Sequence, residues 1–375
     1  MQVFGLSSFY LVVMEFDYTG RLRRIEGLME QRSVDALLLS VGPDLPYFTG
    51  YEAMASERLT MLVIRPGEEP MLLVPRLEAP RVAPGPFELR AWDETDDPIV
   101  LVSRALTGAQ HIAVGDHTWA AFVVELQHAV DADAWTTASG LTKHLRMRKE
   151  PNEIEALREV AEQADRVATR IPDEVQFKGS TEHAVSMRVK NMLIEEGHDQ
   201  ALFAIVASGP NGASPHHEAG DRVIGAGDMI VLDFGGSLDG YRSDTTRTFV
   251  VDEPTNKQRE VHLVVLGAST AGRAAVAPEV RCEEIDRAAR SVIEDAGFGK
   301  YFVHRTGHGI GLEGHEHPYI VEGNSLPLEP GMAFSIEPGV YLPGEFGVRI
   351  EDIVTVTSHG IDVLNESPRG LQPVR

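Results

Sequence analysis

The sequence predicts a two-domain protein of the α+β class, with an α/β domain over residues 1–145 and a mixed β and helical domain over residues 146–375. Two observations support this division. At 375 residues and 43% hydrophobic content, the chain exceeds what one core normally supports. In the first part short apolar strands alternate with helical segments, whereas after Ala201 apolar runs are separated mainly by glycine-rich turns.

The first domain is expected to be layered, because its strand-like and helix-like segments have the lengths typical of α/β folds. Its apolar patterns predict a helix over 21–31, a helix after residue 116, and strands over 34–41, 58–67, 70–76 and 111–116. Its histidine, aspartate and glutamate residues are scattered, so we interpret them as surface residues without a catalytic role.

A long amphipathic helix within 146–172 is expected to open the second domain. Its apolar residues recur at helical spacing after Pro151, and Pro172 is expected to end it. A second helix is predicted near 181–196, with Gly197 as its stop. The remaining pattern predicts strands and two more helices, around 257–277 and 282–296.

Composition excludes several classes of protein. The chain carries 34 basic and 57 acidic residues, a net charge of −23, so neither nucleic acid nor a membrane surface is an expected partner. Its one cysteine, Cys282, excludes an internal disulfide and a thiolate-rich zinc site and fits the reducing cytoplasm, where we expect the protein. The uncharged segment 3–14 is too short to span a bilayer and lacks signal-peptide features, so we interpret it as an extension, with Met14 as an alternative start.

Five acidic or imidazole residues stand in apolar or glycine-rich contexts. They are Asp233 in VLDFG, Asp244 in YRSDTTRT, His308 in RTGHGIG, Glu337 in FSIEPGVY and Glu351 in VRIEDIV. Asp233 lies inside a run that a strand would bury on both faces, and a buried charge needs a partner. Asp244 returns on the next strand-like run, and Arg349 and Glu351 are predicted to share one face of a strand.

Metal ions would explain this set. Four carboxylates that converge in a core repel one another and become protonated unless cations hold them together. Four carboxylates and one imidazole favour Mn²⁺, with Co²⁺, Fe²⁺ or Zn²⁺ as alternatives, and suffice for two ions. Each residue alone also fits an ordinary role, such as a salt bridge, a loop histidine or a turn cap, and no short motif links them. A nucleotide loop at GHGIG is disfavoured, because the last glycine of GxGxxG is missing.

The order and the amino-acid sequences of these segments resemble those of the pita-bread metallopeptidases, the group of methionine aminopeptidase, aminopeptidase P and prolidase. The resemblance covers about residues 150–375, and the phrases that carry it are HRTGHGIGLEGHE, GMAFSIEPGVY and RIEDIV. The preceding domain resembles the creatinase-like amino-terminal domain of the prolidase and aminopeptidase P branch, which methionine aminopeptidases lack. The resemblance therefore implies a creatinase-like α/β domain followed by a pita-bread catalytic domain.

The resemblance also implies a ligand set for two divalent ions. It implies that Asp233 holds one ion alone and that His308 and Glu337 complete the site of the other. Asp244 and Glu351 would bridge the pair, so that all five positions match the pattern of the family.

Catalytic roles follow from the same resemblance. A hydroxide bridging the ions would attack the scissile carbonyl, and Glu337 would carry its proton to the leaving nitrogen. His315 would stabilise the oxyanion and His216 would position the substrate. Arg349 is expected to orient Glu351. The further residues expected to line the cleft are His217, His304, His317 and Tyr319.

The expected activity is hydrolysis of the Xaa-Pro bond of dipeptides, and the alternative is Xaa-Pro aminopeptidase (aminopeptidase P) activity on longer peptides. A dipeptidase must read the free carboxylate, a task suited to arginine. Some prolidases have an arginine directly after the proline of the HExP phrase, where this chain has Tyr319. Arg58 and Arg305 are therefore the candidates for binding the free carboxylate. Family analogy predicts a homodimer. Relatives without the ligands act as binding modules; this acidic chain keeps all five positions, which disfavours that function and metal-free creatinase-like chemistry.

Overall fold

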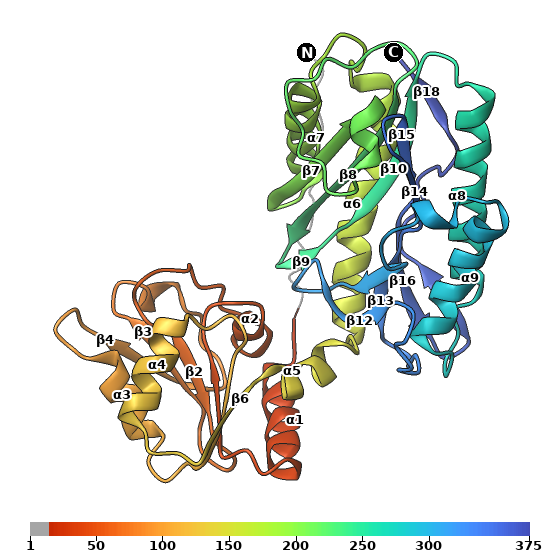
Figure 1. Cartoon of the computed structure of the whole chain (residues 1–375). Helices are drawn as coiled ribbons and strands as arrows, with labels where there is room; N and C mark the ends of the chain where they lie inside the picture. The colour runs from red at the N-terminus through yellow and green to blue at the C-terminus, as the bar shows by residue number, and fades with distance from the viewer. Residues whose placement is uncertain (1–14) are drawn as a thin grey trace, which may run out of the picture.

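The computed structural model describes residues 15–375 and contains a smaller amino-terminal part and a larger carboxy-terminal part (Figure 1). The uncharged segment 3–14 and the alternative start at Met14 lie outside the described residues. Within residues 15–375, no helix combines the length and the apolar character that crossing a membrane requires.

The amino-terminal part is one six-stranded sheet with helices on both faces (Figure 1). Its elements are α1 (Tyr18–Gln31), β1 (Ala36–Leu39), α2 (Asp44–Thr49), β2 (Met61–Ile64), β3 (Met71–Pro75), the 3₁₀ helix η1 (Ala79–Arg81), β4 (Glu88–Trp92), α3 (Pro98–Ala105), β5 (His111–Val114), α4 (Ala120–Ala129), β6 (Ala134–Thr137) and α5 (Ser139–Arg146). The strand order is β4-β3-β2-β1-β5-β6, and β1 pairs antiparallel with β2 but parallel with β5.

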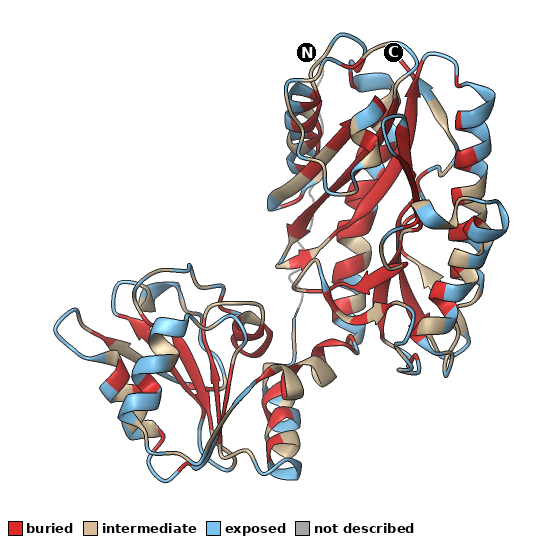
Figure 2. Ribbon diagram, viewed as in Figure 1, coloured by how far each residue is buried: buried red, intermediate tan, exposed pale blue. Residues whose placement is uncertain are grey.

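Alternation along β1 explains why helices cover both faces. Leu37 and Leu39 pack in a cluster with side chains of α1, α2 and α5, whereas Ala36 and Leu38 pack with side chains of α3 and α4. Successive side chains of a strand point to opposite faces, so a strand buried on both sides reads as a continuous apolar run. Figure 2 shows these strands buried between helices whose outer faces are exposed.

The helix predicted over 21–31 and the four strands predicted in this part are confirmed, with ends shifted by a few residues. The sequence pattern does not reveal α2, α3, α5, β4 or β6. The two strands among these form the edges of the sheet, and most of their residues are exposed or half-buried. They therefore lack the apolar run by which a buried strand is recognised.

The carboxy-terminal part contains two larger sheets, a β-hairpin and four long helices. Its elements are α6 (Pro151–Glu174), α7 (Glu182–Glu196), β7 (Gln200–Ser208), η2 (Gly209–Ala213), β8 (Met229–Leu238), β9 (Tyr241–Arg242), β10 (Thr245–Val251), α8 (Asn256–Ala274), α9 (Cys282–Asp295), η3 (Gly299–Tyr301), β11 (Gly307–Gly309), β12 (Glu316–Ile320), β13 (Ala333–Ile336), β14 (Gly339–Leu342), β15 (Phe346–Arg349), β16 (Asp352–Thr357), β17 (Gly360–Val363) and β18 (Gln372–Val374). One sheet has the order β18-β10-β8-β7, the other has the order β12-β11-β13-β16-β17, and β14 pairs with β15.

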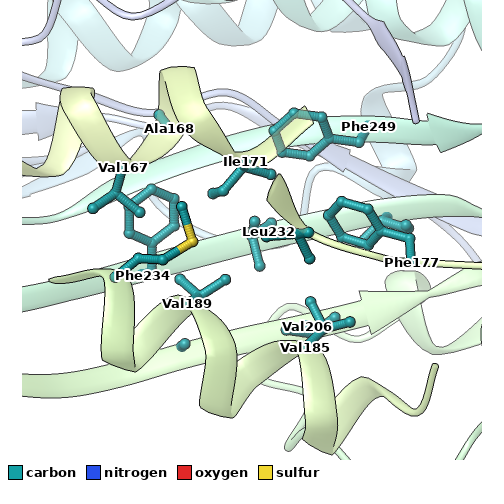
Figure 3. Close-up of a cluster of buried hydrophobic side chains, with 14 of the residues drawn as sticks. Val167, Ala168, Ile171, Phe177, Val185, Val189, Val206, Leu232, Phe234 and Phe249 are labelled. Carbon is teal, nitrogen blue, oxygen red and sulfur yellow. The ribbon is translucent and has the colours of Figure 1, made fainter. Parts of the chain in front are cut away.

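Helices cover the outside of this part. Figure 3 shows Ile171 of α6 and Val189 of α7 in the apolar cluster with Leu232 and Phe234 of β8. Side chains of α8 and α9 pack in two further clusters with β13, β14, β15 and β16. The sheet faces turned away from these helices carry the polar residues of the site.

Four helices predicted for this part are confirmed, with one correction. α6 begins at Pro151, where a proline is well tolerated, but it continues past Pro172 to Glu174. Proline removes one backbone donor near the end of the helix, and the buried neighbour Ile171 still packs that last turn into the core. α7 ends as predicted, at Gly197 with a φ of 113°.

Buried ion pairs join the two parts beside the site. Arg146, at the end of α5, pairs with Asp44 of α2 at 2.8 Å and with Glu313 at 2.7 Å. It also pairs with Glu316, the first residue of β12. Arg146 thus links the amino-terminal part to both ends of the segment 313–316, which contains His315.

Candidate metal centre

Two acidic residues of the site come from the first sheet. Leu232 and Phe234 of β8 pack against α6 and α7, so Asp233 between them points to the opposite face. β8 pairs antiparallel with β10, with Asp233 opposite Thr246. Asp244 lies in the short gap between β9 and β10, not within a strand as predicted, and the chain reversal returns it to Asp233.

His308 lies at the centre of β11, between two glycines that allow close packing. A Cβ atom at Gly307 would lie 1.8 Å from the carbonyl oxygen of Ser335, and one at Gly309 would lie 2.2 Å from that of His317. Any larger residue would therefore push β12 and β13 away from β11. The Gly-His-Gly phrase thus positions the imidazole between close strands.

The remaining two carboxylates follow or precede strands. Glu337 follows β13, and its backbone N–H donates to the carbonyl of Thr306 at 2.8 Å. The N–H of Glu351 donates to the carbonyl of Thr246 at 3.1 Å, which links it to β10. The side chains of Arg349 and Glu351 both contact the hydroxyl of Thr246, but the two residues do not share a strand as predicted, because β15 ends at Arg349 and the N–H of Glu351 donates to β10.

The structure brings all five predicted ligand residues together. Ligand atoms lie within 4.8 Å of one another in three overlapping groups, which are Asp244–His308–His315, His308–Glu337–Glu351 and Asp233–Asp244–Glu351. The Nε2 atom of His308 lies 3.3 Å from Oε1 of Glu337 and 3.8 Å from Oδ2 of Asp244. His315 joins this set, since its ring stacks on that of His308 with a centroid distance of 3.7 Å.

Burial and mutual repulsion raise the pKa values of the carboxylates. Burial, followed by the charge of Glu351, raises the pKa of Asp244 well above its usual range, and burial with the charge of Glu337 does the same for Glu351. Burial raises the pKa of Glu337 to about 7. Burial lowers the pKa of His308 to about 3, which leaves the imidazole neutral and able to ligate. Divalent cations would relieve the repulsion among these carboxylates.

The donor set fits divalent cations. Oδ1 of Asp233 is buried and has no hydrogen-bond partner among residues 15–375, although buried carboxylate oxygens normally have one. Thr246 donates to Oε2 of Glu351 at 2.7 Å, and Ser335 donates to Oε1 of Glu337 at 3.2 Å, so these two carboxylates are oriented. Oxygen-rich donors with one neutral imidazole suit hard or borderline divalent ions.

Arg349 forms an ion pair with one carboxylate of the cluster. The residue is 3% exposed, and its Nη2 donates to Oδ2 of Asp233 at 2.6 Å. Its Nε donates to Thr246 at 3.1 Å, and its Nη1 donates to the hydroxyl of Tyr341 at 2.9 Å. The sequence predicted that Arg349 orients Glu351; the structure shows direct contact with Asp233, and Glu351 is reached only through Thr246.

A cavity of about 620 Å³ opens at the cluster. The predicted residues that line it, besides the five ligand candidates and Arg349, are His216, His304, His315 and Arg305. His304 also shares a hydrogen bond of 2.8 Å with the hydroxyl of Tyr341. One wall is apolar and consists of Leu202, Phe203 and Ile205 of β7 together with Pro215.

Three residues expected to line the cleft do not line this cavity. His217 turns away, with its Nε2 2.8 Å from Oε2 of the buried Glu182. His317 and Tyr319 line a separate cavity of about 260 Å³ that shares only His315 with the first. Alternate residues of β12 are buried, so His317 and Tyr319 point together to its other face.

Sequence reasoning does not single out Tyr341, Thr246 or Arg242, although all three lie at the site. Tyr341 and Thr246 hold Arg349 and Glu351, and Arg242 lines the cavity. The sequence around Tyr341 and Thr246 gives no hint of a role, because tyrosine and threonine are common in buried strands. Their role becomes visible only through their hydrogen-bond partners, Arg349 for Tyr341 and Glu351 for Thr246.

The α/β domain and the sheet-lined cavity with its buried carboxylates define a divalent-metal enzyme with the pita-bread architecture. Residues 155–358 match metallopeptidase family M24, and residues 21–148 match the creatinase/prolidase N-terminal domain. The chain belongs to metallopeptidase family M24. The sequence prediction of a creatinase-like domain followed by a pita-bread metallopeptidase domain is therefore confirmed.

Individual relatives resemble the chain over nearly its whole length. It is 42% identical over 361 residues to the probable dipeptidase PepE of Mycobacterium tuberculosis, covering 94% of this chain and 96% of the relative. It is 33% identical over 366 residues to the Xaa-Pro dipeptidase of Lactobacillus delbrueckii subsp. lactis, covering 94% and 98%. Its structure resembles the crystal structure of recombinant prolidase from Thermococcus sibiricus, with a TM-score of 0.91, 32% identity and coverage of 96% and 100%.

Proposed function

We propose that this chain is a Xaa-Pro dipeptidase, a metallopeptidase that hydrolyses the bond before a carboxy-terminal proline. The observation that carries the proposal is the buried cluster of four carboxylates and one imidazole at a cavity with an apolar wall. The names of two relatives, Xaa-Pro dipeptidase and prolidase, support this substrate class. A cavity of about 620 Å³ has the size of a small-ligand site.

We propose that two divalent ions bind at the cluster. Asp233, Asp244, His308, Glu337 and Glu351 would hold them, with Asp244 and Glu351 shared between the two. When bound, such ions activate water at neutral pH and polarise the scissile carbonyl. Oxygen donors dominate the set, so Mn²⁺ is the proposed metal, with Co²⁺, Fe²⁺ and Zn²⁺ as alternatives.

The residues of the chain supply proton transfer and positioning in this proposal. Glu337, oriented by the hydroxyl of Ser335 at 3.2 Å, would accept a proton from water and return it to the leaving nitrogen. His315 faces the cavity and donates a hydrogen bond to the oxygen of the scissile carbonyl as charge develops there. His216, in the loop before β8, positions the substrate from another side.

The apolar wall supports selection of proline. Phe203 and Ile205 of β7 and the ring of Pro215 offer apolar surface to a pyrrolidine ring. The Xaa-Pro bond has no N–H, so a site for it needs no acceptor at the scissile nitrogen before the leaving group forms.

Three further parts of the proposal concern the whole protein. We propose a domain boundary at residues 145/146, in the last turn of α5 and shortly before α6 begins at Pro151. We propose a cytoplasmic location, supported by the single buried cysteine, Cys282. We also propose a homodimer, by analogy with the family, which sedimentation analysis of the purified protein tests.

A substrate panel tests the function. We expect Mn²⁺-loaded protein to cleave Ala-Pro and Leu-Pro with a higher kcat/KM than Ala-Pro-Ala, and to leave Ala-Ala nearly uncut. Faster cleavage of the tripeptide would assign Xaa-Pro aminopeptidase activity instead. No cleavage of any Xaa-Pro bond by protein with two bound ions would refute the proposal.

A further inference from the structure

Arg305 faces the cavity, and no carboxylate of the part of the chain that the structure describes pairs with it. The chain has 57 acidic and 34 basic residues, and Arg349, which also lines the cavity, is paired with Asp233. No aspartate or glutamate oxygen of residues 15–375 lies within 4.0 Å of the guanidinium nitrogens of Arg305. A guanidinium that lines a site without such a partner is available to an anionic ligand.

The position of Arg305 is fixed by aromatic contacts. Its guanidinium carbon lies 4.2 Å from the ring centroid of Tyr319, and its Nη2 lies 3.3 Å from Nδ1 of His315. Tyr319 in turn packs against His317 at 4.7 Å between ring centroids. Stacking on a ring restrains the plane of a guanidinium and leaves N–H groups at its edge free for a planar anion.

We propose that Arg305 is the specificity-determining residue that binds the free carboxylate of the dipeptide. This inference rests on the proposed dipeptidase function. In a dipeptide the terminal carboxylate is only a few bonds from the scissile carbonyl. The residue that binds the carboxylate must therefore lie next to the residue that contacts the scissile carbonyl. Arg305 is the neighbour of His315, which has that role in the proposed function.

The same contact explains discrimination against longer peptides. In a tripeptide an amide replaces the carboxylate after proline, so the charge-assisted bidentate hydrogen bond to Arg305 is lost. The guanidinium would then face a neutral group in place of an anion, which binds it more weakly. Selectivity thus comes from the charge of the substrate terminus.

Two other arginines fit this role less well. Arg58 is bound to Glu94 at 2.7 Å and does not line the cavity. Arg242 lines it, but its Nε donates to the carbonyl of Leu312 at 3.3 Å. Arg242 also borders a second cavity lined by acidic residues, among them Asp239, which disfavours an anion there.

The test compares two substrates that differ only in terminal charge, Ala-Pro and Ala-Pro-amide, on Mn²⁺-loaded full-length protein. We expect Arg305→Gln to lower kcat/KM for Ala-Pro about 10- to 100-fold, mainly through KM, as expected for loss of a hydrogen bond to a charged group. We expect less than about threefold change for Ala-Pro-amide, which lacks that bond. Arg305→Lys keeps the positive charge but cannot form the bidentate hydrogen bond, so it should recover part of the lost kcat/KM for Ala-Pro. The exposed Arg58→Gln is the matched control and should keep wild-type values for both substrates.

Other results would overturn the assignment. Equal loss for both substrates in Arg305→Gln would show that Arg305 only holds His315. Loss of carboxylate preference in Arg242→Gln, with Arg305→Gln unchanged, would transfer the role to Arg242. Bound Mn²⁺ and the thermal midpoint are measured for every variant, and Arg305→Lys serves if the glutamine variant does not fold. Wild-type protein that holds Mn²⁺ and cleaves neither substrate would refute the proposed function, and the role of Arg305 with it.

Discussion

Replacing Arg349 with methionine should destabilise the metal-free protein more than the metal-loaded protein. In the metal-free state the variant loses a charge-assisted bond to Asp233, worth about 1.5–3 kcal/mol, and bonds to Thr246 and Tyr341, worth about 0.5–1.5 kcal/mol each. The sum agrees with the cost of about 3–5 kcal/mol for breaking a buried ion pair. We therefore expect the free energy of unfolding to fall by about 3–5 kcal/mol without metal.

Bound cations should reduce this loss, because they compensate the charge of Asp233 when Arg349 is absent. The hydrogen bonds to the uncharged acceptors Thr246 and Tyr341, and the longer one of 3.3 Å to the carbonyl of Pro215, are lost in both states, so we expect a decrease of about 1–3 kcal/mol with metal. By linkage, the difference appears as tighter Mn²⁺ binding by the variant.

Urea unfolding with a chelator and with excess Mn²⁺ measures both values, and calorimetric titration of Mn²⁺ measures the affinity. Arg58→Met, at an exposed arginine, is the control and should change stability by less than about 0.5 kcal/mol. Equal losses for Arg349→Met in the two states would refute the idea that Arg349 and the cations compensate the same charge.

Three further predictions concern the ligands and the core. Asp244→Asn should lower kcat/KM by more than about 100-fold, beyond the usual effect of an outer partner of a metal site, and near-normal rates would contradict its place as a shared ligand. Burial raises the pKa of Glu337 to about 7 and those of Asp244 and Glu351 well above their usual range, so Mn²⁺ must displace protons from these carboxyl groups. Calorimetry should therefore show the Mn²⁺ affinity falling as the pH drops from 7, by at least about tenfold per unit. An equal affinity at pH 6 and pH 8 would contradict this. Leu193→Ala, at a fully buried position of α7, should lower the free energy of unfolding measured in urea by about 2–5 kcal/mol. Leu263→Ala, at a position of α8 that is 64% exposed, should lower it by less than about 0.5 kcal/mol. Similar values for the two variants would contradict the burial argument.

The sequence by itself determined which residues needed a partner. Asp233 stands inside an apolar strand pattern, and the glycines around His308 mark a close backbone approach, so each position signals its own unusual environment. The same local rules predicted the long helices, whose buried faces repeat at helical spacing. They failed at edge strands such as β4, where too few residues are buried to leave a pattern.

The tertiary structure alone decided which of these residues meet. Periodicity places a side chain on one face of its own strand or helix, but it carries no information on the element packed against that face. His217 and His216 are adjacent in sequence, yet one turns to buried Glu182 and the other faces the cavity. Arg58 and Arg305 look equivalent as cations until the sheets place carboxylates beside the first and an open cavity beside the second. The packing of sheets and helices decides which distant segments lie close together. It therefore also decides which charged side chains have a partner of opposite charge and which do not.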